Sequence, residues 1–445
     1  MTIHIIGAGL AGCEAAWQAA NRGVRVKLYE MKPQKFSLAH SNENFAELVC
    51  SNSFKAQNIE NATGLLKKEL ELGGSLIMQA AHKTKVPAGG ALAVDRERFS
   101  EYITHKIKAH ANIEIINGEA DDLSAFNGET VIIATGPLTS DRLQQSIKEL
   151  LGEEYLSFFD AAAPIVSLES IDFDSAFYAS RYDKGGKDYI NCPLTEEEYN
   201  IFYNELINAE CVQPREFEKD IYEGCMPVEI TARRGESTLL FGCMKPVGII
   251  DERTGKQPYA VVQLRQDNAA GSMYNIVGFQ TNLKFGEQKR VFSLIPALKN
   301  CEFLRYGVMH RNTFINSPKL LDSSYNLRND RNRNGNENEN IYFAGQITGV
   351  EGYIESASSG FAAGIAAAEK ILTGRKVIFP RFTVIGALAH YISDERITDF
   401  QPMGANFGIV ESPSERIRGG KRNIRQRMSE ISLEYMQNFS QALHP

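Results

Sequence analysis

The chain has 445 residues, a length typical of two or three domains, and its 43% hydrophobic content is ample for a large core. Its net charge of -7 excludes a polycation, so an RNA partner would need a local basic surface. The N-terminus lacks the features of a signal peptide, and no apolar run reaches the ~18 residues of a membrane span. The seven cysteines are scattered without zinc-ligand spacing, so we expect a reduced, cytoplasmic protein with no metal.

The first thirty residues predict a strand, a glycine turn, a helix and a second strand. Residues 3–6 are a short apolar run, residues 13–21 are rich in Ala, and residues 24–30 alternate and end on Glu30. The turn between the first strand and the helix is Gly7-Ala8-Gly9-Leu10-Ala11-Gly12. Together these parts form the dinucleotide-binding fingerprint in its required context.

Each part of this fingerprint has a physical role in holding a dinucleotide. Gly7 permits a tight turn, and Gly12 lets the helix and the strand pack closely. Gly9 lets backbone N–H groups approach a pyrophosphate at the helix N-terminus, where the macrodipole favours anions. Glu30 can accept hydrogen bonds from ribose hydroxyls. The alternative is a fortuitous glycine-rich turn, which the surrounding pattern disfavours.

The rest of the first 150 residues predicts further parts of the same parallel sheet. Helical spacing covers residues 65–81 and 96–110, and strands are predicted at 113–116 and 130–133. The last of these strands ends in a turn at Thr135 and Gly136. A polar stretch at residues 40–57 surrounds a single cysteine, Cys50.

The pattern changes between residues 151 and 329. Strands at 261–264 and 274–279 lie among polar loops and a helix near 195–208, which predicts an inserted α+β domain. An Asn- and charge-rich run at 329–340 marks its end and is typical of a solvated loop.

A second strand, glycine turn and helix come late in the chain, at 341–345, 346–349 and 355–372. A two-dinucleotide flavoprotein domain needs such a late unit, because the helix N-terminus can face the pyrimidine edge of a flavin. The alternative is an ordinary closing βα unit. We therefore predict an α/β fold, with a Rossmann-like FAD-binding domain of the two-dinucleotide type and an inserted α+β domain. The expected segments are 1–150 (FAD-binding domain, first part), 151–329 (inserted substrate domain) and 330–445 (second part, with a basic C-terminal segment).

The C-terminal segment carries six cations with no acid among them: Arg416, Arg418, Lys421, Arg422, Arg425 and Arg427. One interpretation is a solvated face beside acidic neighbours such as Glu430. The other is a phosphate track for nucleic acid. The sequence leaves both open.

Blocks along nearly the full chain resemble one family. They are Leu48-Val-Cys50-Ser-Asn-Ser53, Gly89-Gly-Ala-Leu-Ala-Val-Asp95-Arg96, Ile133-Ala-Thr135-Gly136-Pro137, Glu223-Gly-Cys225-Met-Pro-Val-Glu229, Phe241-Gly-Cys-Met-Lys-Pro-Val-Gly248, Gly278-Phe-Gln-Thr-Asn282, His310-Arg311-Asn312-Thr-Phe-Ile-Asn-Ser-Pro318 and Tyr342-Phe-Ala-Gly345-Gln346-Ile-Thr-Gly-Val-Glu351-Gly352-Tyr353. Together they closely resemble the folate- and FAD-dependent tRNA (uracil-5-)-methyltransferases, the TrmFO family. They are also similar to the N-terminal half of the longer GidA-type tRNA modification proteins. The run at 329–340 departs from the family's shorter connection.

The resemblance implies FAD as cofactor, 5,10-methylenetetrahydrofolate as one-carbon donor, NAD(P)H as reductant and a uridine of the tRNA T loop, position 54, as substrate. Carbon 5 of uracil is a weak nucleophile, so a thiolate must add at carbon 6, a base must remove the carbon-5 proton, and a hydride must reduce the exocyclic methylene. The resemblance places Cys225 and Cys50 in this catalysis. We favour Cys225 as the nucleophile and Cys50 as proton acceptor or second thiol, and the reverse assignment stays open. Without the resemblance, a single cysteine is more often buried filler.

The resemblance also assigns ligand-binding residues. For the flavin these are the fingerprint residues Gly7 to Gly12 with Glu30, Lys32, Asp95, Arg96, Thr135, Gly136, Gly345 and Gln346, and with Glu351, Gly352 and Tyr353 bordering its ring. Phe285 is expected to face the folate pterin, with a core aromatic as the alternative. His310, Arg311 and Asn312 are expected to hold the folate glutamate or an RNA phosphate, with a structural histidine as the alternative. Arg418, Arg422 and Arg425 are the expected tRNA track.

Three other functions remain open on the sequence. The same chemistry on ribosomal RNA would keep every motif. A plain flavin NAD(P)H oxidoreductase would need neither Cys50 nor Cys225. A GidA-like RNA-binding partner would lack independent methyl transfer.

Overall fold

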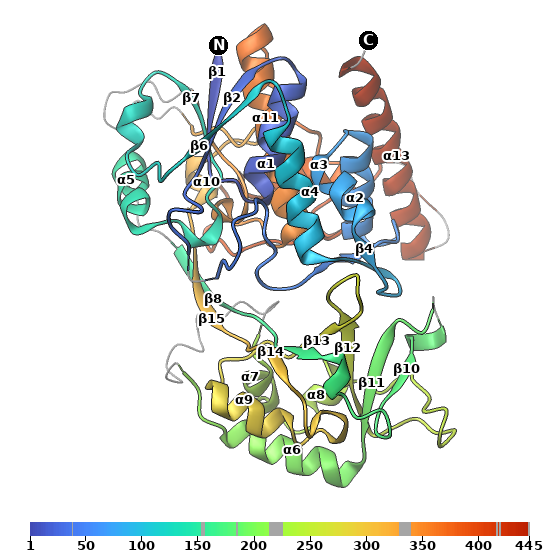
Figure 1. The fold of residues 1–445 in the computed structure, drawn as a ribbon. Coiled ribbons are helices and arrows are strands. Elements are labelled where there is room, and N and C mark those ends of the chain that lie inside the picture. The colour runs from blue at the N-terminus through green and yellow to red at the C-terminus, as the bar shows by residue number, and fades with distance from the viewer. Residues whose placement is uncertain are drawn as a thin grey trace.

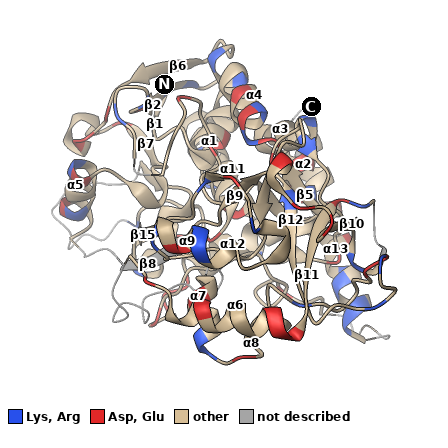
Figure 2. Ribbon diagram, turned by 60° about the horizontal axis from the view of Figure 1, so that its bottom comes forward, with Lys and Arg blue, Asp and Glu red and all other residues tan. Residues whose placement is uncertain are grey.

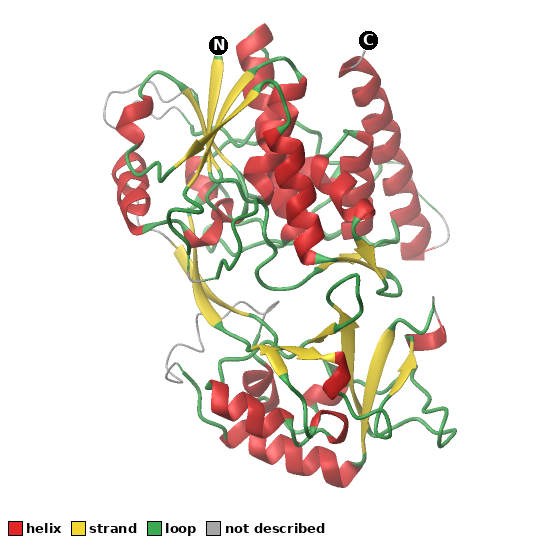
Figure 3. Ribbon diagram, viewed as in Figure 1, coloured by secondary structure: helices red, strands yellow, loops and turns green. Residues whose placement is uncertain are grey.

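Two regions joined by a two-stranded ribbon make up the computed structural model (Figures 1 and 3). The parallel-sheet region comprises residues 1–152 and 314–443, and the antiparallel-sheet region comprises residues 162–308. Each region has its own large hydrophobic core. The structure describes residues 1–37, 39–152, 156–183, 186–212, 226–328, 340–414, 417 and 420–443.

Five parallel strands form the central sheet of the first region, in the order β16-β7-β1-β2-β6. Their bounds are β1 Thr2–Ile6, β2 Arg25–Glu30, β6 Ile113–Asn117, β7 Thr130–Ile133 and β16 Ile341–Phe343. Ile3 and Ile5 are completely buried. A parallel sheet covered on both faces requires apolar strands, which explains why these strands could be predicted from short apolar runs.

The helices of this region pack against the sheet and against one another (Figure 1). They are α1 Leu10–Asn21, α2 Ala62–Leu72, α3 Leu76–Lys83, α4 Arg96–Lys108, α5 Asp141–Leu151, α10 Ser317–Leu320, α11 Tyr353–Thr373, α12 Val384–Tyr391 and α13 Gly420–Leu443, and α13 lies beside α2. Helices α1 and α11 cross closely because α11 presents glycines: a Cβ added at Gly360 would lie 2.1 Å from the carbonyl oxygen of Ala11. The early fingerprint helix and the late helix are therefore direct neighbours.

The helical spacing over 65–81 corresponds to two helices in the structure, separated by a short turn. Helix α2 ends at Leu72, and Gly73 and Gly74 follow, the second with a φ of +75°. Ser75 then caps α3 by accepting a hydrogen bond from the N–H of Met78 at 3.2 Å. Glycine is the residue that most readily takes a left-handed conformation, and it ends the first helix here. A small antiparallel sheet lies beside these helices, formed by β3 Ser53–Ala56, β4 Lys85–Val86 and β5 Ala91–Val94.

A six-stranded antiparallel sheet forms the second region, in the order β10-β11-β12-β13-β9-β14. The strands are β9 Ile165–Ser167, β10 Phe177–Ala179, β11 Tyr189–Leu194, β12 Ala260–Gln266, β13 Met273–Ile276 and β14 Phe303–Arg305. The helices are α6 Glu196–Asn208, α7 Val228–Arg233, α8 Thr238–Phe241 and α9 Phe285–Phe292. The strand predicted over 274–279 ends earlier, at Ile276, and Gly278 follows with a φ of +78°.

The chain leaves and rejoins the first region through one ribbon. Strand β8 Leu156–Ala161 pairs antiparallel with β15 Met309–Phe314. Phe314, which ends β15, and Leu320 and Leu327 beyond it are buried in the core of the parallel-sheet region. The chain therefore returns before residue 329, where the sequence analysis placed the end of the inserted domain. Of the expected loop 329–340, only residue 340 is described.

Polar contacts fix the two regions against each other. The backbone N–H of Gly89 donates to Asp188 at 2.6 Å, and the Tyr189 hydroxyl donates to the carbonyl oxygen of Ala88 at 3.0 Å. The backbone N–H of Ala269 donates to Asp95 at 2.7 Å. Within the described ranges, none of the helices combines the length and the hydropathy needed to cross a bilayer.

Candidate active site

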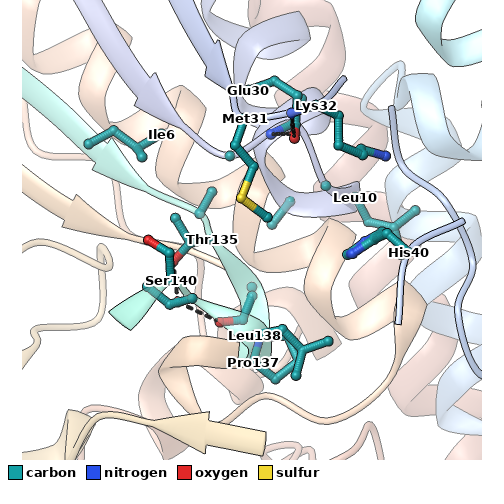
Figure 4. A pocket seen from close by; sticks show the side chains of 18 of the residues that line it. Ile6, Leu10, Glu30, Met31, Lys32, His40, Thr135, Pro137, Leu138 and Ser140 are labelled. Carbon is teal, nitrogen blue, oxygen red and sulfur yellow. Dashed lines mark hydrogen bonds between the residues drawn. The ribbon is translucent and has the colours of Figure 1, made fainter. Parts of the chain in front are cut away.

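A cavity lies at the carboxyl edge of the parallel sheet (Figure 4). Its lining includes a residue at or just after the carboxyl end of each strand of this sheet: Ile6, Glu30, Gly118, Ala134 and Gly345. Figure 4 shows Glu30 and Lys32 on one wall and Thr135 and Ser140 on the other. Ligands of open parallel sheets bind at this edge.

Within the glycine turn between β1 and α1, some glycines are required for packing and another faces the cavity. A Cβ at Gly12 would lie 1.8 Å from the carbonyl oxygen of Gly7, so Gly12 is required for packing. Gly7 has a φ of +99°, and its Cβ would lie 2.7 Å from the carbonyl oxygen of Ala134. A Cβ at Gly9 would meet nothing within 4 Å, and Gly9 lines the cavity. Gly9 is therefore where a ligand can approach the backbone.

The N-terminus of α1 presents uncapped N–H groups at the cavity. Gly9 is the N-cap residue and has no side chain to accept from the first turn. Leu10 and Ala11, which begin the helix, line the cavity. Unsatisfied N–H groups and the helix dipole make such a terminus a site for an anion such as a pyrophosphate.

Glu30 closes the turn from the end of β2. One carboxylate oxygen accepts from the N–H of Ala8 at 3.0 Å and the other from the N–H of Lys32 at 3.0 Å. The ammonium of Lys32 donates to the carbonyl oxygens of Asn42, at 3.2 Å, and of Asn44. Lys32 thus holds the cavity wall formed by residues 40–47, and Glu30 stands at the cavity with lone pairs left to accept further hydrogen bonds.

The glycine turn after the late strand β16 and the N-terminus of helix α11 line the same cavity from the other side. Gly345, with a φ of +86°, and Gln346 line it after β16. Tyr353, the first residue of α11, also lines it. The cavity is therefore bordered by the N-termini of two neighbouring helices, each of which favours negative charge on a ligand.

Not all predicted cofactor residues reach the cavity lining. Gly7, Ala8, Gly9, Leu10, Ala11, Glu30, Lys32, Thr135, Gly136, Gly345, Gln346 and Tyr353 belong to it, whereas Gly12, Asp95, Arg96, Glu351 and Gly352 do not. Asp95 caps α4 by accepting from the N–H of Arg98 at 3.0 Å. Glu351 accepts from the side-chain amide of Gln346 at 2.6 Å and so orients a lining residue.

Part of the lining was not predicted from the sequence, including His40, Glu47, Gly118, Leu138 and Ser140. Gly118 lies two residues after the predicted strand at 113–116, so the rule that ligands bind at strand ends could have found it. His40 and Glu47 lie in a loop without local periodicity, and no sequence signal places them at the cavity.

Cys50 lies in a loop that borders the cavity. Val49 and Tyr353 are in the lining, and the Tyr353 hydroxyl accepts from the N–H groups of Cys50 at 2.8 Å and Ser51 at 3.0 Å. Burial raises the pKa of Tyr353, which keeps this hydroxyl protonated. The Cys50 sulfur is 3.7 Å from the carbonyl oxygen of Ala161 on β8. The loop that carries the predicted thiol is thus tied to the cavity, to α11 and to the ribbon.

Other predicted residues lie elsewhere or outside the described residues. Phe285 begins α9 with 54% of its surface exposed, and its ring stacks on Tyr306 with centroids 5.0 Å apart. Asn312 is buried on β15. Cys225 and Arg418 fall outside the described residues, as do the side chains of His310 and Arg311.

The basic residues of α13 are on the surface (Figure 2). Arg422 is 79% exposed and pairs with Glu60 at 2.7 Å. Arg425 lies 5.5 Å from the ring centroid of Phe407. Among the described residues, we find no group of three or more His, Cys, Asp or Glu that could hold a metal ion.

The parallel sheet, the glycine turn, the acid that closes it and the cavity between two helix N-termini define a Rossmann-like α/β protein with an FAD-binding fold. A family model described as "Glucose inhibited division protein A" matches residues 2–375. The methylenetetrahydrofolate--tRNA-(uracil-5-)-methyltransferase TrmFO of Acetivibrio thermocellus is 59% identical over 442 residues, 98% of this chain and 99% of the relative. The protein of that name from Bacillus subtilis is 53% identical over 443 residues, 99% of each chain. The chain belongs to the TrmFO family.

Solved structures support the same fold. GidA of Aquifex aeolicus, in its form I crystal, matches with a TM-score of 0.69 and covers 99% of this chain and 76% of that chain. The sequence identity is 16%, so this likeness concerns the fold alone.

Proposed function

We propose that this chain is an FAD-dependent methyltransferase that forms 5-methyluridine at position 54 in the T arm of tRNA. In this proposal 5,10-methylenetetrahydrofolate supplies the carbon and NAD(P)H the electrons. The observation that carries it is the identity of 53–59%, over at least 98% of the chain, to relatives named for methylenetetrahydrofolate, tRNA and uracil-5 methyl transfer.

The cavity residues fit FAD. Gly9 leaves room for a pyrophosphate beside the N–H groups of α1, and the Glu30 carboxylate can accept from ribose hydroxyls. The N-terminus of α11, at Tyr353, would meet the ring end of the cofactor. When bound, FAD supplies the redox chemistry that converts the transferred methylene to methyl.

The thiols would act on the uracil ring itself. A thiolate that adds to carbon 6 makes carbon 5 nucleophilic, and a base then removes the carbon-5 proton. We assign the addition to Cys225 and the proton to the sulfur of Cys50, with the reverse assignment left for experiment. The position of Cys50 beside the cavity supports a part in catalysis, because Val49 and Tyr353, which flank and hold it, line the cavity.

The aromatic and basic surfaces would bind the other ligands. The exposed ring of Phe285, backed by Tyr306, offers a stacking face for the pterin. Asn312, with His310 and Arg311, would hold the folate glutamate or a phosphate. The basic residues of α13 would contact tRNA phosphates, and backbone contacts of this kind offset the few kcal/mol that extrusion of a uridine from the T arm costs.

The test is mass spectrometry of the T-loop fragment of unmodified tRNA. The tRNA is incubated with flavin-loaded protein, methylenetetrahydrofolate and NADPH, beside Cys225→Ala, Cys50→Ala and the control Cys243→Ala, whose thiol lies in the antiparallel-sheet region. We expect one methyl on the uridine with wild type and the control, and a loss of at least about 1,000-fold with either of the other two. Methylation of rRNA but not tRNA would move the substrate to ribosomal RNA. Flavin reduction without RNA methylation would indicate a plain oxidoreductase.

A further inference from the structure

Three arginines from three separate elements converge on the loop that carries Cys50. We call residues 48–52 the Cys50 loop. Arg96 begins α4, Arg265 lies on β12 and Arg305 ends β14. Two of the three therefore come from the antiparallel-sheet region, although the loop belongs to the parallel-sheet region.

Every residue of the Cys50 loop accepts a guanidinium hydrogen bond. Arg96 donates to the carbonyl oxygens of Leu48 at 2.7 Å and Cys50 at 3.2 Å. Arg305 donates to the carbonyl oxygen of Val49 at 2.7 Å. Arg265 donates to the Ser51 hydroxyl at 2.9 Å and to the Asn52 side chain at 3.0 Å. A guanidinium presents five N–H donors in a rigid fork, which suits it to fix a loop in this way.

The group carries more positive than negative charge. Among the described residues, the carboxylate that forms an ion pair with these arginines is Asp267, 3.0 Å from Arg96 and 1% exposed. Burial, and with it the charge of Arg96, lowers the pKa of both Arg265 and Arg305. Because buried like charges cost free energy, a cluster of this kind is stabilised by a further negative charge.

Cys50 lies close enough to all three arginines for a charge on its sulfur to interact with each of them. Around Cys50 the described chain places Arg96 from α4, Arg265 from β12, Arg305 from β14 and the protonated hydroxyl of Tyr353 from α11, and Asp267 forms an ion pair with Arg96. Cations near a thiol favour its thiolate form.

We propose that Arg96, Arg265 and Arg305 are positioning residues that hold the Cys50 loop at the cavity and keep Cys50 in its thiolate form. The catalytic use of that thiolate rests on the function proposed above. The arrangement makes the reactivity of Cys50 depend on docking of the antiparallel-sheet region, which supplies two of the three cations.

The test is the pH dependence of Cys50 alkylation by iodoacetamide in flavin-loaded protein, followed by mass spectrometry of the Cys50 peptide. In wild type we expect half-maximal alkylation below the value of about 8.5 typical of a free cysteine. Arg305→Gln and Arg265→Gln should each slow the reaction about five- to tenfold at pH 7 and move the profile to higher pH. Arg305→Lys, which keeps the charge, should restore most of the rate.

The matched control is Arg181→Gln. Arg181 is also a part-buried arginine of the antiparallel-sheet region, but it donates to Gln263 and to the carbonyl oxygen of Val247. It should leave the Cys50 profile unchanged. Flavin content and circular dichroism establish that each variant is folded.

A wild-type profile centred near that of free cysteine would overturn the inference without recourse to any variant. So would Gln variants that are folded and keep the wild-type profile. Alkylation needs neither tRNA nor folate, so its outcome is independent of the proposed function. A shifted profile in a protein that transfers no methyl would uphold the arginine–thiolate arrangement and refute the methyltransferase.

Discussion

The two regions contribute to the site in different ways. The parallel-sheet region supplies mostly backbone, in the glycine turn, two helix N-termini and the carboxyl ends of strands, together with the side chains of Glu30 and Arg96. The antiparallel-sheet region supplies side chains, Arg265 and Arg305, from separate strands. A site built from backbone groups requires glycines at a fixed local spacing in the sequence. A site built from side chains requires only a suitable residue at the appropriate end of a strand. The first kind of site leaves a signature in the sequence and the second does not.

The largest expected effect comes from adding one methyl group to the glycine turn. In Gly12→Ala the Cβ would lie 1.8 Å from the carbonyl oxygen of Gly7, so α1 must move away from β1. We expect a loss of about 3 kcal/mol in the free energy of unfolding and loss of bound flavin. Urea denaturation and the visible absorbance of the purified protein measure both quantities.

The variants Gly9→Ala and Gly90→Ala are compared with Gly12→Ala to separate flavin binding from stability. Both positions have open space around an added Cβ, and Gly9 lines the cavity while Gly90 does not. Gly9→Ala should keep its stability and lose flavin affinity, and Gly90→Ala should change neither. If Gly9→Ala bound flavin as wild type does, the backbone of this turn would not be the ligand contact.

The next effect tests Glu69, one of the buried acids of the parallel-sheet region. Glu69 of α2 accepts from the N–H groups of Val384 at 2.8 Å and Ile385 at 2.9 Å, at the start of α12, and from Ser432 of α13 at 2.6 Å. Burial raises the pKa of Glu69 to about 7, against the opposing effect of these hydrogen bonds.

Because this pKa is higher in the folded than in the unfolded state, the folded protein binds more protons between about pH 4.5 and 7. The contribution of Glu69 to the free energy of unfolding is thus greatest below pH 4.5 and is lost as the pH rises to 7. Glu69→Gln should remove this slope, which amounts to about 2 kcal/mol. Urea denaturation at pH 5 and pH 8 measures it, with the exposed Glu434→Gln of α13 as control. Equal slopes in wild type and Glu69→Gln would contradict the assignment.

The smallest expected effect is on tRNA binding, and it tests which of the two regions binds the RNA. Charge reversal of the exposed Arg422 and Arg425 together should weaken tRNA binding about tenfold. The slope of log affinity against log salt concentration should become shallower by the amount expected for the loss of about two phosphate contacts. Filter binding at several salt concentrations measures both. The matched double variant is Lys187→Glu with Lys299→Glu, two exposed lysines of the antiparallel-sheet region. A larger loss in that control than in the α13 variant would place the RNA on the other region.

Much of the parallel-sheet region could be predicted. The strands at 3–6, 113–116 and 130–133 were confirmed because buried parallel strands are short apolar runs. The late strand and helix were also confirmed, and the cavity brings them beside the fingerprint. Helical structure over 65–81 was confirmed, but the break at Gly73 and Gly74 was not predicted, because the pattern of apolar residues continues through it while the backbone does not. The resemblance to the TrmFO family was confirmed by the relatives.

The convergence on Cys50 could not be predicted. Arg265 and Arg305 lie 214 and 256 residues from their partners in the Cys50 loop, and neither belongs to a local motif. Only the docking of one sheet against another brings them there. The roles of Cys50 and Cys225 and the ligand contacts of the predicted site residues stay predictions.

The position of β16 has a consequence for synthesis of the chain. Strand β16 pairs with β7 at one edge of the parallel sheet, and about 200 residues separate them, so at 5–20 residues per second β7 waits roughly 10–40 s on the ribosome for its neighbour. During that time β7 is an open edge strand with a buried-type apolar sequence, the kind of segment that pairs with other chains. The antiparallel-sheet region, made in the interval, can fold around its own core, while the nucleotide cavity cannot close until β16 and α11 have emerged.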